Sequence, residues 1–234
     1  MFIVKIKIIM NICIIGDGLT ALSLAKNLIN KKINVHIYHQ NKMKNFSSSR
    51  TIGISQNNLE FFRKEIHMYS KKIFWKIKKI EIYSEKLEKE NLLNFEKDKG
   101  ELFYMVKNDD LYDSLINIMS KNKYFKKKLI KNKLFYESIV KKKMYDLIIN
   151  CESNNFLSNK FFTKKIQKNY DNFAYTTILK HKNIKNNNIA TQVFTKNGPV
   201  AFLPIANNET SIVCSLDTKN RKYKDSEIFD LIIK

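Results

Sequence analysis

The fold of this chain is decided by the stretch NICIIGDGLTALSLAKNLINKKINVHIYHQ, residues 11–40. Residues 11–15 form a short apolar run, which predicts a buried strand. Apolar residues then recur at helical spacing over 19–31, and residues 33–38 alternate as a half-buried strand does. A strand, a tight turn, a helix and a second strand within about thirty residues form the pattern of a βαβ unit. We therefore predict an α/β fold that begins with this unit.

The turn between the first strand and the helix reads GDGLTA and has the glycine spacing of a dinucleotide-binding loop. Gly16 allows a tight turn, and Gly18 lets the backbone approach a pyrophosphate. Ala21 is the third small position, where helix and strand pack closely. The backbone amides of Leu19 and Thr20 open the helix and can face an anion. Two of the five glycines in the chain lie in this turn, which favours a dinucleotide site over an ordinary strand-to-helix turn.

Two nearby residues leave the identity of the dinucleotide open. Asp17 places a negative charge beside the expected pyrophosphate, which is unfavourable unless its side chain points away. About 20 residues beyond the loop, where an acid usually binds the ribose hydroxyls, the chain has His39. A neutral imidazole can make one such hydrogen bond. Alternatively, His39 with Lys42 and Lys44 receives the 2′-phosphate of NADP, or His39 is a plain surface residue.

After residue 40 the pattern changes from a βα repeat to alternating strands. Helical spacing returns over 56–66 and 108–120, and a last helix starts at Asp225. Alternation of apolar with polar or charged residues predicts antiparallel strands elsewhere. These strand patterns lie at 73–85, at 92–106 across a turn at Gly100, at two or three places within 127–151, and over 168–217.

We therefore predict an α/β chain in which two domains are interleaved. The first is a discontinuous, Rossmann-like nucleotide-binding domain at 10–72 and 104–164. The second is an antiparallel β-sheet domain at 73–103 and 165–234, which would bind the substrate.

Composition argues against a nucleic-acid-binding protein. The 234-residue chain has a formal net charge of +21, but only three of its 43 basic residues are Arg. Base readout and bidentate phosphate contacts favour Arg, and the lysines here are spread along the chain. We expect no nucleic-acid partner, although a weak attraction to anionic lipid head groups stays open.

The cysteines and the apolar segments bear on the compartment. Cys13, Cys151 and Cys214 are far apart in the sequence and show no metal-ligand or disulfide spacing, which indicates a reducing compartment. No stretch is long and apolar enough to span a bilayer. The first residues include Lys5 and Lys7 and no small-residue cleavage site, unlike a signal peptide. We expect a cytoplasmic protein.

Three later stretches, together with the loop, resemble one enzyme family. They are SSRTIGIS at 48–55, GELFYMVKNDDLYDSLI at 100–116 and NIATQVFTKNGPVAFLPIANNETSIVCSL at 188–216. The chain resembles the flavin-dependent aromatic hydroxylases of ubiquinone biosynthesis, within the FAD monooxygenase family typified by p-hydroxybenzoate hydroxylase. The last stretch is the most specific. It is similar to that subgroup's Ala-x-Gln-x-Phe, Gly-Pro-x-Ala-x-Leu-Pro and Ser-x-Val-x-Ser, and it contains both prolines of the chain.

The resemblance implies FAD as the cofactor, with NAD(P)H and O2 as co-substrates and with no side chain assigned a catalytic step of its own. It places His39 where the family usually has Glu, and Cys151, Glu152 and Ser153 where the family has Ala-Asp-Gly. The residues implied to bind the cofactor are Gly16, Gly18, Leu19, Thr20, Ala21, His39, Arg50, Asn108, Leu111 and Glu152. Those implied to line the substrate pocket are Gly198, Pro199, Phe202 and Pro204.

The same resemblance implies hydroxylation of an aromatic ring of a (poly)prenylated phenol in ubiquinone biosynthesis. Such a substrate implies peripheral association with the inner face of the membrane and a complex with other ubiquinone-biosynthesis proteins. The family's later Gly-Asp motif has no counterpart, because the one Gly-Asp pair is Gly16–Asp17. We therefore expect a C-terminally truncated member of the family.

Three alternatives follow from these departures. The chain could be a non-catalytic remnant that has lost flavin, or one half of a split flavoenzyme. An NADP-dependent oxidoreductase without flavin is less favoured, because it predicts further βα units after residue 40, where the sequence indicates antiparallel strands.

Overall fold

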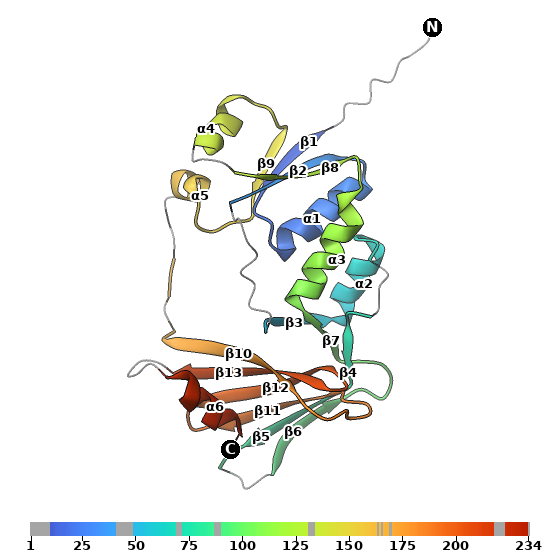
Figure 1. The fold of residues 1–234 in the computed structure, drawn as a ribbon, viewed down its shortest axis with the longest axis vertical. Helices are drawn as coiled ribbons and strands as arrows, with labels where there is room; N and C mark the ends of the chain where they lie inside the picture. Colours follow the sequence, from blue (N-terminus) through green and yellow to red (C-terminus); the bar gives the residue numbers. More distant parts are fainter. Residues whose placement is uncertain are drawn as a thin grey trace. The chain divides into compact units, whose positions relative to one another are not determined.

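The computed structural model describes residues 10–40, 49–68, 72–86, 90–130, 134–162, 164, 166–168, 170–217 and 223–233. The chain divides into two compact units (Figure 1). The first unit comprises residues 1–45, 62–68 and 111–166, and the second comprises 46–61, 69–110 and 167–234.

The first unit is built on a four-stranded parallel sheet with the strand order β8-β2-β1-β9. Helix α1 (Leu19–Asn30) connects β1 (Asn11–Ile15) to the parallel strand β2 (Asn34–His39), so the predicted βαβ unit is confirmed. Strand β8 (Phe125–Leu129) pairs with β2, and β9 (Leu147–Asn150) pairs with β1, both in parallel. Taken in chain order, this is the 3-2-1-4 arrangement of a Rossmann fold.

Strands β8 and β9 correct the expectation that no βα units follow residue 40. The segment 127–151, predicted as two or three short strands, contains helix α4 (Leu134–Lys141) between them. Its sequence LFYESIVK is rich in aromatic and β-branched residues, which favour strands. However, Tyr136 and Ile139 lie three residues apart and are both buried against the sheet. Burial of one helical face overrides the local propensity.

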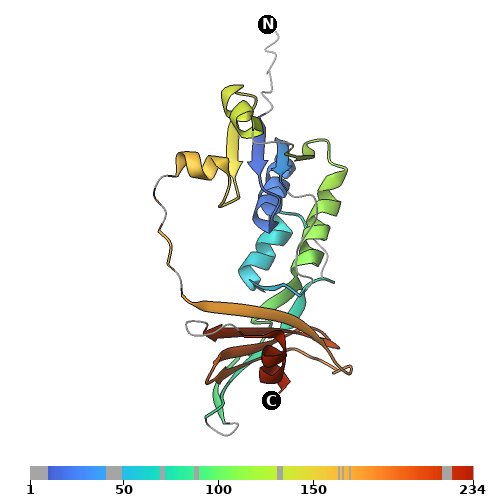
Figure 2. The same ribbon diagram turned by 60° about the vertical axis from the view of Figure 1, so that its left-hand side comes forward.

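Helices cover both faces of the parallel sheet (Figure 2). On one face, Cys13, Ile15 and Tyr38 pack with Tyr136 and with Leu157 of the short helix α5 (Phe156–Phe161). The alternate side chains of β1 and β2 point to the other face, which α1 covers with its own buried residues. The central strand is therefore buried on both sides.

The second unit contains a six-stranded sheet with the order β10-β13-β12-β11-β5-β6. Its pairs are antiparallel, as predicted, except for β5 and β11, which run parallel. The strands are β5 (Lys79–Ser84), β6 (Asn91–Glu96), β10 (Asn172–Lys180), β11 (Ile189–Thr195), β12 (Gly198–Ala206) and β13 (Glu209–Asp217). Helix α6 (Asp225–Ile233) covers one face, where Ile228 packs in a cluster that includes Val200 and Phe202.

A separate three-stranded sheet has the order β3-β7-β4. Its strands are β3 (Thr51–Ser55), β4 (Trp75–Ile77) and β7 (Phe103–Lys107). The predicted strand at 73–85 is thus split between two sheets. The predicted hairpin across Gly100 does not form, because β6 pairs with β5 whereas β7 pairs with β3 and β4.

The pairing of β3 with β7 also bears on the unit boundaries. Residues 46–61 and 104–110, which the sequence analysis assigns to the first domain, cluster with the second unit for this reason. Helices α2 (Gln56–Lys64) and α3 (Asn108–Ser120) form where helices were predicted, and each starts in the second unit and ends in the first.

The backbone of Gly198 on β12 lies close to the backbone of β13, and a substitution at Gly198 tests this close approach. Its φ is +131°, and a Cβ atom there would lie 2.0 Å from the backbone oxygen of Ser215. We expect Gly198→Ala to lower the free energy of unfolding by about 3 kcal/mol or more, because the backbone must move. Gly53→Ala is the matched control, since its Cβ would meet the Phe103 ring at an ordinary 3.5 Å. Urea unfolding of both variants measures the difference, and equal losses would contradict the strain argument.

Candidate functional site

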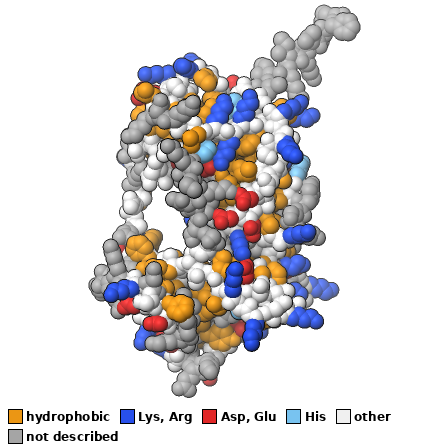
Figure 3. All heavy atoms as spheres, viewed as in Figure 1, with side chains coloured by type: hydrophobic (Ala, Val, Ile, Leu, Met, Phe, Trp, Pro, Cys, Tyr) orange, Lys and Arg blue, Asp and Glu red, His pale blue; other side chains and the backbone are white. Residues whose placement is uncertain are grey.

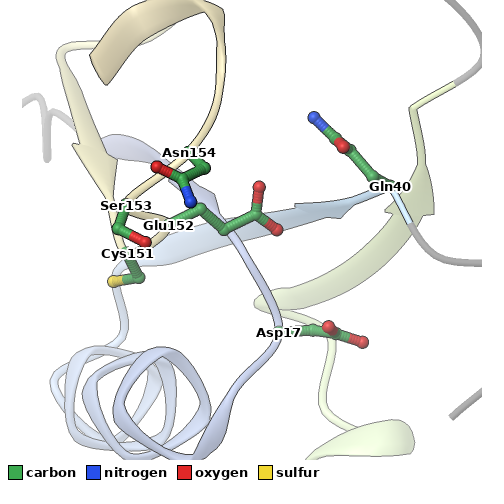
Figure 4. Close-up of a pocket in the computed structure, with 6 residues that line it drawn as sticks. All are labelled: Asp17, Gln40, Cys151, Glu152, Ser153 and Asn154. Carbon is green, nitrogen blue, oxygen red and sulfur yellow. The ribbon is translucent and has the colours of Figure 1, made fainter. Parts of the chain in front are cut away.

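The candidate site lies at the carboxyl ends of three parallel strands of the first unit. An open pocket of about 540 Å³ is lined by Asp17, Gln40, Cys151, Glu152, Ser153 and Asn154 (Figure 4). These residues directly follow β1, β2 and β9. In open α/β sheets, ligands bind outside the carboxyl ends of the strands where the strand order reverses, which here is beside β1 and β9. The pocket therefore has the position of a ligand site.

The two glycines of the loop have different roles. Gly16 has a φ of +102°, and a Cβ there would lie 2.9 Å from Cγ of Glu152. Gly18 is the N-cap of α1 with a φ of −67°, and no described protein atom lies within 4 Å of the place that its Cβ would take. Folding therefore requires a glycine at position 16. At position 18 the missing side chain leaves open space before the helix.

The start of α1 supplies unpaired donors to that open space. The first backbone N–H groups of a helix have no acceptor within the helix, and no described side chain caps the N-terminus of α1. Leu19 and Thr20 are the first two residues of the helix, whereas Ala21 is fully buried. The partial positive charge of the helix N-terminus attracts an anion at this position.

The side chain of Asp17 is held by groups from other elements of the first unit. Its Oδ2 lies 2.7 Å from Nζ of Lys127 on β8 and accepts a hydrogen bond of 2.9 Å from the Tyr112 hydroxyl on α3. Lys127 also donates to the Tyr112 oxygen at 2.6 Å. Nδ1 of His39 lies 3.8 Å from the same carboxylate oxygen. The charge of Asp17, unfavourable in the sequence analysis, is thus balanced by Lys127.

The two carboxylates of the pocket have opposite pKa shifts. Burial alone would raise the pKa of Asp17, but the hydrogen bonds from Lys127 and Tyr112 and the charges of Lys127 and His39 lower it overall. Burial raises the pKa of Glu152, and the negative charge of Asp17 adds to the rise, against a hydrogen bond with Asn155 that lowers it. Glu152 therefore accepts a proton more readily than Asp17.

Side chains rather than glycine hold the turn after β9. Asn155 donates to Oδ1 of Asn150 at 2.7 Å, and its own Oδ1 accepts from the backbone of Ser158 at 2.9 Å. The Ser158 hydroxyl donates to the backbone oxygen of Glu152 at 2.8 Å. The turn where the resemblance expects Ala-Asp-Gly is therefore fixed by this polar network, and Glu152 extends from it into the pocket (Figure 4).

The first unit contains most of the residues predicted to bind the cofactor. These are Gly16, Gly18, Leu19, Thr20, Ala21, His39, Leu111 and Glu152. Lys42 and Lys44, proposed partners of a 2′-phosphate, lie outside the described residues. Leu111 is a buried core residue of α3.

Arg50 and Asn108 are neighbours in the second unit. The backbone N–H of Asn108 donates to the backbone oxygen of exposed Arg50 at 3.0 Å. The Asn108 side chain is buried, and its Oδ1, like that of Asp109, has no hydrogen-bond partner among the described residues. An unpaired buried oxygen is costly, and a bound ligand is one means of pairing it.

The residues predicted to line the substrate pocket all lie on β12. Pro199 and Phe202 are three residues apart and therefore point to opposite faces of the strand. Phe202 packs in the cluster beneath α6, and Pro204 is buried. The positive φ of Gly198 and its close approach to the backbone of Ser215 explain the glycine at that position. A ligand bound on one face of the sheet would contact Pro199 or Phe202 but not both. The assignment of these residues to the substrate pocket stays a prediction.

Sequence reasoning missed the residues that support the site, above all Tyr112, Lys127, Asn155 and Ser158. Lys127 stands in the run FKKKL, where its neighbours carry the same charge and no spacing distinguishes it. A tyrosine on the buried face of α3 looks like a core residue. The contacts of these four side chains depend on the fold, so no local pattern could have identified them.

Among the described residues, two further features are absent. No described helix has both the length and the apolar character needed to cross a bilayer. No group of three or more His, Cys, Asp and Glu side chains in the described segments is placed to hold a metal ion.

The fold is similar to that of several solved structures. The tetrameric form of 2-methyl-3-hydroxypyridine-5-carboxylic acid oxygenase matches with a TM-score of 0.74 and 11% identity, over 96% of this chain and 64% of that one. CtdE in complex with FAD and a substrate matches with a TM-score of 0.71 and 11% identity, over 96% and 63%. HpxO of Klebsiella pneumoniae, complexed with FAD and uric acid, matches with a TM-score of 0.68 and 12% identity, over 95% and 60%.

These matches confirm the predicted fold class: a Rossmann-like parallel sheet interleaved with antiparallel sheets. The chain spans 60% to 64% of the length of the three structures. No protein-family model matches the chain, and no curated protein sequence matches it.

The contacts of Asp17 predict how stability depends on pH. A carboxylate whose pKa is lowered by folding stabilises the protein above its unfolded pKa, near 3.8, and this contribution is lost as the pH falls through the lower folded value. We expect Asp17→Asn to be less stable than the wild type at pH 7 and at pH 5, with a difference that shrinks below pH 4. Urea unfolding across this pH range measures it.

Asp98→Asn is the matched control, because Asp98 is an exposed aspartate. A difference between wild type and Asp17→Asn that stays constant from pH 7 to pH 3 would contradict the pairing of Asp17 with Lys127.

Proposed function

We propose that this chain binds FAD through the loop between β1 and α1 and acts in a flavin-dependent aromatic monooxygenase. One observation carries the proposal: the described residues leave open space at the Cβ position of Gly18, the N-cap residue that precedes the amides of Leu19 and Thr20. That space lies at the end of the central strand of a 3-2-1-4 parallel sheet, where dinucleotides bind. The likeness to structures crystallised with FAD supports this choice of dinucleotide.

The residues present fit such a group. The amides of Leu19 and Thr20 would face the pyrophosphate, and Asp17 does not oppose it because Lys127 balances its charge. His39 and Glu152 are among the described side chains at this edge of the sheet that could form hydrogen bonds with ribose hydroxyls.

Bound FAD would supply the redox chemistry, with NAD(P)H as the reductant and O2 as the oxygen source. The side chains of this chain would bind and orient the reactants. On the face of the six-stranded sheet opposite α6, Ala201 lies between Gln192 and Val213. Small and apolar side chains with one amide suit a flat aromatic ring that carries a polar substituent. We propose this face as the substrate surface.

The finer assignments rest on the sequence resemblance. We propose a (poly)prenylated phenol of ubiquinone biosynthesis as the substrate, a cytoplasmic location with peripheral membrane association, and a complex with other proteins of that pathway. Basic side chains are scattered over the face shown in Figure 3. We propose no nucleic-acid partner, because only three of the 43 basic residues of the chain are Arg.

Titration with FAD tests the cofactor. We expect saturable binding, read by quenching of flavin fluorescence, and a loss of about tenfold or more in affinity for Gly18→Ala, because the methyl group occupies the approach of the pyrophosphate. Thermal stability without FAD should not change, since the added Cβ meets no described atom within 4 Å. Gly53→Ala serves as the control for a methyl group added elsewhere.

Each other outcome selects a different account. Binding of NADP without FAD would favour the NADP-dependent oxidoreductase, whose βα units the structure provides in part through β8 and β9. Binding of neither would favour the non-catalytic remnant.

The substrate class has its own test. We expect flavin-loaded protein to consume O2 with NAD(P)H faster in the presence of a prenylated phenol than with the same phenol lacking its prenyl chain. Equal rates with both phenols would remove the prenyl group from the proposal. Sedimentation with vesicles of anionic and of neutral lipid tests membrane association in parallel.

A further inference from the structure

We propose that Lys127 is a positioning residue for the dinucleotide loop, acting through Asp17 and Tyr112. This proposal rests on the proposed function, because the loop it positions is the one assigned to FAD. It concerns a residue outside the loop, on the edge strand β8. The three side chains are called the loop clamp.

The loop clamp is a closed set of contacts between three elements of the first unit. Lys127 Nζ contacts the Asp17 carboxylate at 2.7 Å and the Tyr112 hydroxyl at 2.6 Å, and that hydroxyl donates to Asp17 at 2.9 Å. The ammonium also lies 5.2 Å from the centre of the Tyr112 ring. Each member contacts both others, so the carboxylate has little freedom to turn toward the pyrophosphate space.

Partial burial strengthens the electrostatic interaction between Lys127 and Asp17. The side chains of Lys127 and Asp17 are 26% and 27% exposed, so solvent and salt screen this pair less than a fully exposed one. The other charged or titratable groups acting on Asp17 are His39 at the end of β2 and Glu152 after β9. Lys127 is the close cation among them, and its loss would leave Asp17 negative beside the phosphates.

Strand alternation makes Lys127 distinct from its neighbours. In β8, Lys127 points to the face of the sheet where α3 carries Tyr112. Lys128 points to the opposite face, where its Nζ lies 5.7 Å from the ring of Tyr38. Lys126 is exposed and shares that opposite face. Lys126 and Lys127 therefore offer the same charge on the same strand, one outside the clamp and one within it.

The test is a double-mutant cycle on FAD affinity. We expect Lys127→Met to weaken FAD binding about tenfold or more, since Asp17 is then unbalanced beside the phosphates. Asp17→Asn with Lys127→Met should bind FAD more tightly than Lys127→Met alone, because the double variant carries no unbalanced charge there. Lys126→Met, the matched control, should bind as the wild type does, and Lys127→Arg should retain most of the affinity.

A purely structural role predicts a different pattern. In that case the double variant would bind as weakly as Lys127→Met, and this result would overturn the proposal. The pH profile separates the roles further: affinity of Lys127→Met should rise more steeply than that of the wild type as the pH falls toward 5, because protonation removes the unbalanced charge of Asp17. The double variant should lack this extra rise.

A second readout needs no cofactor. Amide hydrogen exchange of the loop and of the first turn of α1 should be faster in Lys127→Met and Tyr112→Phe than in the wild type or Lys126→Met. If the wild type binds neither FAD nor ADP, the proposed function fails, yet this measurement still decides whether the clamp orders the loop. Unchanged exchange in both variants would refute the clamp itself.

Discussion

Parallel pairing of β1 on both of its sides is the constraint on which the first unit depends. β1 pairs with β2 on one side and with β9 on the other, and Cys13, Ile14 and Ile15 have no exposed surface. Because the three strands run in one direction, the residues that follow them emerge at a single edge of the sheet. Asp17, Gln40 and Glu152 therefore meet at one pocket although they are distant in sequence. The topology makes the pocket, and the residues after each strand determine its chemistry.

The electrostatics of this pocket differ from what its lining residues suggest. Among the described residues, two carboxylates and no cation line it, which by itself would oppose a pyrophosphate. However, the ammonium of Lys127 balances the negative charge of the Asp17 carboxylate, and burial raises the pKa of Glu152.

The sequence predicted the parts of the fold that depend on local patterns. The βαβ unit, α3 and the late strands each have a clear period, and Gly16 occupies a turn that needs a glycine. Helix α4 was missed because its residues favour strands, and only burial of Tyr136 and Ile139 against the sheet selects a helix. The loop clamp could not be predicted, because Lys127 is one of several similar lysines and its contacts exist only after β8 joins the sheet.

The most specific part of the sequence resemblance is explained partly by folding. Gly198 is required by its positive φ and by the close approach of Ser215. Pro204 stands where the register of β12 against β13 shifts, and proline in a sheet is confined to edges and such irregularities. These residues are consistent with the fold and carry little information on a substrate. Gln192 and Ala201 have no such backbone reason, and they pair across β11 and β12 on the face opposite α6. These two side chains belong to the face that we propose as the substrate surface.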